Sequence, residues 1–177
     1  MRHWPWAIPL LVVGLYWSHT WQATWVYEDF RLVSAISEPT PISGMRSLSL
    51  ASWRLTPTPQ AAHALSVSLH LVVIALLGAL AWRLGYSKAG VGLVALFGAI
   101  HPLTVESVAY ATARSELLAA LGVLLSVWCA AGRWWKPWPI LGIVAGTVFG
   151  MLGKESAVVV GGLVPLTILV RSRPDAP

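Results

Sequence analysis

Apolar residues occur along this chain in long runs that are separated by short polar segments. Runs that approach about 20 residues are long enough for a helix to cross the hydrocarbon core of a bilayer. The pattern predicts six membrane-spanning helices, and it predicts one long loop over 25–61. The predicted spans cover about 6–24, 62–84, 89–100, 117–131, 138–152 and 157–170. We therefore expect an all-α fold, a polytopic transmembrane helical bundle that forms a single integral membrane domain over 1–177.

Local signals refine the ends of these helices. Pro102 is expected to stop the third span, and 103–112 is expected to form a short helix lying along the membrane. Ser115 is expected to cap the fourth span, and Glu116 to lie at its positive end. The first apolar run follows Arg2 like the opening of a signal peptide, but no small-residue cleavage site follows it. We therefore expect it to be retained as the first helix.

The composition agrees with a membrane protein. Of the 177 residues, 56% are hydrophobic and 11% are charged, and the mean hydropathy is +0.69. A soluble domain needs more polar surface than this composition provides. The isoelectric point of about 9.9 is also found in nucleic-acid-binding proteins. Here, however, the basic residues are scattered and lie mainly at the ends of apolar runs, so topology explains them and no nucleic acid partner is expected.

The distribution of charge predicts the orientation of the bundle. With the N-terminus inside, the inner side carries more Lys and Arg than the outer side, which favours a cytoplasmic location for both termini. The inner basic residues are Arg2, Arg83, Lys88, Arg133, Lys136, Arg171 and Arg173, and the outer ones are Arg31, Arg46, Arg54, Arg114 and Lys154. The acids on the outer side are Glu28, Asp29, Glu38, Glu106, Glu116 and Glu155. Because only Asp175 remains inside, we expect the outer face to carry the chemistry, in a bacterial inner (cytoplasmic) membrane.

Ionisable residues on this outer face are candidates for function. His101, Glu106 and Arg114 lie between the third and fourth spans, and ionisable groups at membrane depth are commonly functional. The adjacent carboxylates of Glu28 and Asp29 could act as a general base or bind a divalent metal, although such pairs also occur in solvated loops.

Basic residues elsewhere on the outer face could bind a phosphate. Arg46 lies in the long loop, and Lys154 with Glu155 lies between the last two spans. These cations could meet a phosphate that arrives from the lipid, but Lys154 and Glu155 could equally just mark a tight turn. His63 and His70 are seven residues apart on one face of the second span, and packing against another helix is favoured over a metal or haem pair.

Five blocks of the chain occur in an order that resembles a known family. They cover about 25–170 and read WVYEDF, RSLSL, AAHALSVSLHLVVIALLGALAWRL, ALFGAIHPLTVESVAYATARSELLAALGVLLSVW and GMLGKESAVVVGGLVPLTILV. Together they resemble the N-terminal part of a GT-C membrane glycosyltransferase, closest to the O-mannosyltransferase-like family that often carries tetratricopeptide repeats. The chain differs from the usual family pattern at Glu28, Thr104 and Ala113, where Asp, His and Gly are usual.

The resemblance implies a reaction and a set of roles. The donor would be a polyprenyl- or dolichyl-phosphate sugar, and the acceptor a hydroxyl on the non-cytoplasmic side. Asp29 or Glu28 would take the acceptor proton. The residues implied to hold the lipid phosphate are Arg46, Arg114 and Lys154, and those implied to shape the site are His101, Glu106 and Glu155.

A second interpretation is a non-catalytic integral scaffold subunit of a larger membrane complex, respiratory or photosynthetic. It rests on the end of the chain at Pro177, where enzymes of that family continue with further helices, and on the abundance of tryptophan for packing against partner subunits. Ion or proton transport is disfavoured, because the inner halves of the predicted spans lack a relay of ionisable residues.

Overall fold

Every regular element in the described part of this chain is helical. The computed structural model describes residues 7–18, 24–25, 29–30, 33, 46–132 and 136–172. The helices are α1 (Ala7–Tyr16), α3 (Ser47–Arg54), α4 (Pro59–Arg83), α5 (Lys88–Ile100), α6 (Pro102–Ala109), α7 (Arg114–Ala130), α8 (Pro137–Gly153) and α9 (Val160–Arg171). Two short 3-10 segments, η2 (Ala111–Ala113) and η3 (Glu155–Val159), lead into α7 and α9. The all-α prediction is confirmed for these residues.

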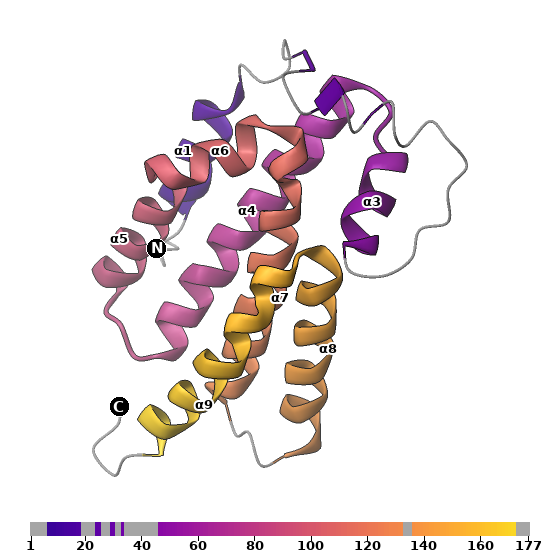
Figure 1. The fold of residues 1–177 in the computed structure, drawn as a ribbon. Coiled ribbons are helices and arrows are strands. Elements are labelled where there is room, and N and C mark those ends of the chain that lie inside the picture. The colour runs from indigo at the N-terminus through magenta and orange to yellow at the C-terminus, as the bar shows by residue number, and fades with distance from the viewer. Residues whose placement is uncertain are drawn as a thin grey trace.

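Helices α4 and α7 form the centre of the bundle (Figure 1). Helices α1 and α5 pack against α4, and α8 and α9 pack against α7. The core between α1, α4, α5 and α6 includes the buried residues Val13, Ile74, Ala95 and Val108. We call the end of the bundle where α4 and α7 begin and α8 ends the upper end (Figure 1). The lower end is the end where α4 stops and α5 and α8 begin.

The structure corrects the predicted number of spans. Two described helical stretches, Pro59–Arg83 and Ala111–Ala130, are long and apolar enough to cross a membrane. Helix α5 has 13 residues and α8 has 17, so at 1.5 Å per residue they are about 20 and 25 Å long, shorter than a hydrocarbon core of about 30 Å. The count of six is therefore wrong by this criterion. Part of the predicted sixth span is a 3-10 turn, and α9 begins only at Val160.

Three of the local predictions around α6 and the start of α7 are confirmed and one is wrong. His101 is extended (φ −62°, ψ 133°) and ends α5, because a residue before proline disfavours the helical conformation. The short helical segment predicted over 103–112 is present as α6 and η2, while its predicted placement along the membrane stays a prediction. Ser115, however, does not cap α7, because η2 continues directly into a helix that already starts at Arg114. Glu116 lies in the first turn of α7, as expected.

Helices α7 and α8 approach each other closely. Their facing surfaces carry buried glycines, Gly122 on α7 with Gly146 and Gly150 on α8. Small residues allow two helix backbones to come into direct contact. The hydroxyl of Ser126 on α7 lies within hydrogen-bond distance (3.1 Å) of the carbonyl oxygen of Ile143 on α8. This pair of helices is therefore held by backbone proximity as well as by apolar contacts.

Candidate functional site

Side chains from distant parts of the sequence meet at the upper end of the bundle. The Asp29 carboxylate accepts a hydrogen bond from the backbone N–H of Thr112, with a distance of 2.9 Å. Thr112 lies only two residues before Arg114, so these two predicted site residues belong to the same end of the protein. Arg46 precedes α3, and Lys154 and Glu155 follow α8, at this same end (Figure 1).

Two ion pairs hold the turn between α8 and η3. Arg46 forms a two-point contact with Glu155, in which Nε donates to Oε2 at 2.8 Å and a second guanidinium nitrogen donates to Oε1. On the other side, Lys154 donates to Glu116 of α7. The Ser156 hydroxyl lies 3.5 Å from the second Glu116 oxygen. The turn is therefore tied both to the start of α3 and to the start of α7.

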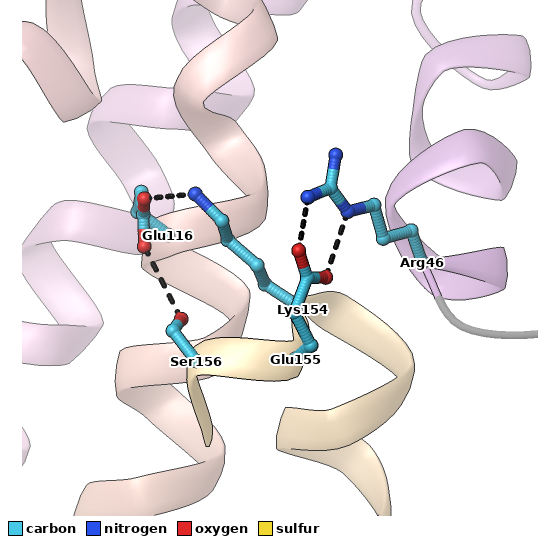
Figure 2. A network of polar contacts seen from close by, with 5 residues as sticks. All are labelled: Arg46, Glu116, Lys154, Glu155 and Ser156. Carbon is cyan, nitrogen blue, oxygen red and sulfur yellow. Dashed lines mark hydrogen bonds and ion pairs between the residues drawn. The ribbon is translucent and has the colours of Figure 1, made fainter. Parts of the chain in front are cut away.

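The local backbone explains how neighbouring residues reach opposite partners. Helix α8 ends at Gly153, and the backbone of the next residue, Lys154, is extended (φ −161°, ψ 146°). Successive side chains on extended backbone point to opposite sides. Figure 2 shows Lys154 pointing toward Glu116 and Glu155 pointing toward Arg46. Both residues therefore do more than mark a tight turn.

The Arg46–Glu155 pair is accessible to solvent. The two side chains are 51% and 48% exposed, and ion pairs at this exposure are screened and individually weak. Arg46 also has a left-handed backbone (φ 70°), which residues with a side chain rarely adopt. Glu155 binds Arg46 through Nε and one terminal nitrogen, and Glu116 binds Lys154. Because a guanidinium has five N–H donors and an ammonium three, a phosphate could bind beside each carboxylate or in its place.

The pairing predicts an unusual titration of Glu155. Its hydrogen bonds with Arg46 lower the pKa of Glu155 from 4.5 to about 2, and the same contact raises the pKa of Arg46. Since the folded-state pKa of Glu155 lies below its ordinary value, the pair favours the folded state above about pH 4.5. That contribution is lost as the pH falls toward 2.

Carbon-13 NMR of the Glu155 carboxyl group should therefore give a midpoint near pH 2. The variant Arg46→Gln should raise this midpoint toward 4.5, whereas Lys154→Gln should raise it less, because Lys154 acts on Glu155 only through longer-range electrostatics. A midpoint near 4.5 in the unmodified protein would contradict the pairing.

Arg114 is fully buried and joins three elements. One terminal nitrogen donates to the carbonyl oxygen of Ser52 (3.1 Å) and to the hydroxyl of Thr56 (3.0 Å). The other donates to the carbonyl oxygen of Ala62 at 3.1 Å. The guanidinium also lies 5.1 Å from the centre of the Trp53 ring. Arg114 therefore links α7 to α3 and to the start of α4. Its predicted role as a phosphate ligand stays a prediction.

Asp29 is also fully buried. Its hydrogen bond to Thr112 places a carboxylate at the N-terminal end of the helical segment that continues into α7, where a negative charge is favourable. Glu28, the other predicted base, lies outside the described residues. The prediction of a metal at Glu28 and Asp29 is therefore not tested, and the described residues contain no cluster of three or more His, Cys, Asp or Glu that could bind one.

The remaining predicted residues lie on other parts of the bundle. The half-buried His101 ends α5, with its ring 4.6 Å from that of Phe97. Glu106 is exposed on α6, which lies near α5 and away from α3 (Figure 1). His70 of α4 is buried with Nε2 3.4 Å from the carbonyl oxygen of Ala99 on α5, which fits the packing interpretation.

Sequence reasoning missed the partners that hold Arg114. Ser52 and Thr56 are four residues apart, at helical spacing, but neither carries a charge that would single it out. It also missed the contact between Glu116 and Lys154, which are 38 residues apart in the chain.

Comparison with known proteins gives no match: no family model, curated protein or solved structure is significantly similar to this chain. The class of protein defined so far is an all-α bundle with two helices of membrane-spanning length in its described part.

Proposed function

We propose that this chain is an integral membrane protein that transfers a sugar from a polyprenyl-phosphate carrier to an acceptor hydroxyl. The observation that supports this proposal is the convergence of charged groups at the upper end. Asp29, Arg46, Glu116 and Lys154 come from separate segments, yet they lie on or beside the starts of α3 and α7. In the proposed orientation the upper end faces the non-cytoplasmic side.

The proposed reaction assigns a role to each group. The bond between the anomeric carbon and the phosphate oxygen breaks, and the acceptor oxygen forms a new bond to that carbon. Asp29 or Glu28 takes the acceptor proton, while Arg46 and Lys154 stabilise the negative charge on the departing lipid phosphate. The phosphate binds Arg46 beside Glu155 or in its place, because the exposed pair is weak and phosphate forms strong bidentate contacts with arginine.

A direct test uses the purified protein in lipid nanodiscs, radiolabelled polyprenyl-phosphate mannose or glucose, and a peptide acceptor containing serine and threonine. We expect sugar transfer, and we expect the double variant Glu28→Gln/Asp29→Asn to reduce it by at least about 100-fold, because general base catalysis contributes a factor of this size. The variant Arg46→Gln should weaken binding of the polyprenyl-phosphate sugar donor.

The matched control is Glu38→Gln, which makes the same carboxylate-to-amide change at an acid of the predicted outer loop that has no assigned role, and it should retain transfer. Full activity of the Glu28→Gln/Asp29→Asn variant would remove the assigned bases. A protein that transfers no sugar from either donor would overturn the proposal.

A second candidate function is that of a non-catalytic subunit in a larger membrane complex. It is favoured by the apolar side chains that α8 and α9 expose, which partner helices could cover. These residues include Trp138, Leu141, Val144, Val148, Leu166 and Leu169. Purification in a fixed ratio with other membrane subunits would support this role. A monomer that binds polyprenyl phosphate would count against it.

A further inference from the structure

The lower end of the bundle carries charge of one sign. Arg83 ends α4, Lys88 begins α5 and Lys136 precedes α8, and all three helix ends lie at the lower end (Figure 1). The acidic residues that the structure describes all lie away from the lower end. They are Asp29, Glu116 and Glu155, together with Glu106 on α6, which also lies away from the lower end (Figure 1). At the upper end, basic and acidic side chains form ion pairs. At the lower end, the described basic residues have no acidic neighbours among the residues that the structure describes.

Exposed aromatic rings lie next to these cations in the sequence. Trp82 is 50% exposed, Tyr86 is 53% exposed and Trp138 is 78% exposed. Near the upper end, Tyr110 is 37% exposed, whereas Trp53 is only 3% exposed and stacks on Trp25 with ring centres 5.5 Å apart. Exposed tryptophan and tyrosine are typical of the headgroup level of a membrane, where the ring is partly apolar and its N–H or O–H meets water.

The basic side chains differ in how they are held. The Arg83 guanidinium lies 4.3 Å from the centre of the Trp128 ring on α7, which fixes it near the end of the α4–α7 contact. Lys88 and Lys136 are exposed at the starts of their helices. A compact ammonium on a flexible stem can reach a phosphate from several directions, whereas the stacked guanidinium offers a fixed position.

We propose that the lower end binds anionic phospholipid headgroups through Arg83, Lys88 and Lys136, with Trp82, Tyr86 and Trp138 inserted beside them at the membrane interface. This inference rests on the membrane placement of the proposed function but not on its chemistry. An acidic phospholipid is the partner because the lower end has positive charges at three helix ends, whereas a zwitterionic headgroup offers no net charge to them. Each basic residue near an anionic surface increases binding by a factor of about five at low ionic strength.

Native mass spectrometry of the detergent-purified protein can measure this preference directly, with phosphatidylglycerol and phosphatidylcholine as probes. We expect phosphatidylglycerol to bind more tightly. The double variant Lys88→Gln/Lys136→Gln should weaken it by a factor on the order of 10, with little change for phosphatidylcholine, because two of the charges are removed. High salt should reduce the preference in the unmodified protein, since the Debye length falls to about 3 Å at 1 M.

The matched control is Arg31→Gln/Arg54→Gln, which removes two cations from the predicted outer segment and should leave the preference unchanged. Equal binding of the two lipids, or an equal loss in the control, would overturn the inference while the proposed function stands. Release of the protein from membranes by an alkaline wash would overturn the membrane placement, and with it both proposals.

Discussion

Replacing Gly122 by alanine is expected to destabilise the protein by about 3 kcal/mol, at the upper end of the usual cost of overpacking. A Cβ atom at this position would lie 2.5 Å from the carbonyl oxygen of Gly146 and 2.5 Å from the Cα of Gly150, and closer still to the Gly150 nitrogen. These are backbone atoms, which cannot rotate away as a flexible side chain can. Helices α7 and α8 would therefore have to separate, which would also lengthen the contact between Ser126 and Ile143.

Thermal unfolding in detergent, followed by circular dichroism, measures this loss, and Gly161→Ala is the matched control. Gly161 lies in α9, and a Cβ atom there would meet nothing within 4 Å. Alanine favours an exposed helix over glycine by up to about 1 kcal/mol, so the control should be neutral or slightly stabilising. An equal loss of stability in both variants would mean that close packing of α7 on α8 is not the cause.

The apolar runs were sufficient to predict most of the long helices but not all of the fold. The runs over 62–84 and 117–131 correspond to α4 and α7. A long uninterrupted apolar run favours a helix, because no other local structure would bury as many of its apolar side chains. Helix α3 was missed because Ser47–Arg54 alternates serine with larger residues and shows no helical period. Its position depends on Arg114, which lies about 60 residues further along the chain.

The location of the candidate site was easier to predict than its contacts. Helices that reverse direction bring their connecting segments to two ends, so a polar cluster at one end could be expected from the sequence. The partners of each charged residue could not be predicted from the sequence, because the charge of a residue does not indicate whether its side chain is buried or exposed. Arg114 was predicted as a phosphate ligand but is buried among protein acceptors, whereas Arg46 is exposed and bound to Glu155. Which of the two arginines is buried depends on how the helices pack at the start of α7.

Replacing Arg114 by methionine is expected to destabilise the protein by about 4 kcal/mol. Methionine is long enough to fill much of the space, but it donates no hydrogen bond. The carbonyl oxygens of Ser52 and Ala62 and the hydroxyl of Thr56 would then lose a charged donor in a buried position. Each such loss typically costs about 1–3 kcal/mol. The variant Arg114→Lys should lose an intermediate amount, because one ammonium cannot reproduce the fork that reaches both α3 and α4.

Hydrogen exchange separates this local effect from general unfolding. In Arg114→Met, the backbone amides of α3 should exchange faster at a denaturant concentration where those of α8 remain protected, since Arg114 is bonded to α3 and not to α8. The matched control is Arg46→Met, which removes the same type of side chain from an exposed pair and should cost a small fraction as much. Equal effects of the two variants would show that burial of Arg114 does not determine its contribution. Protection of α3 in Arg114→Met would show that its apolar contacts and the Arg46–Glu155 pair hold α3 to the bundle without Arg114.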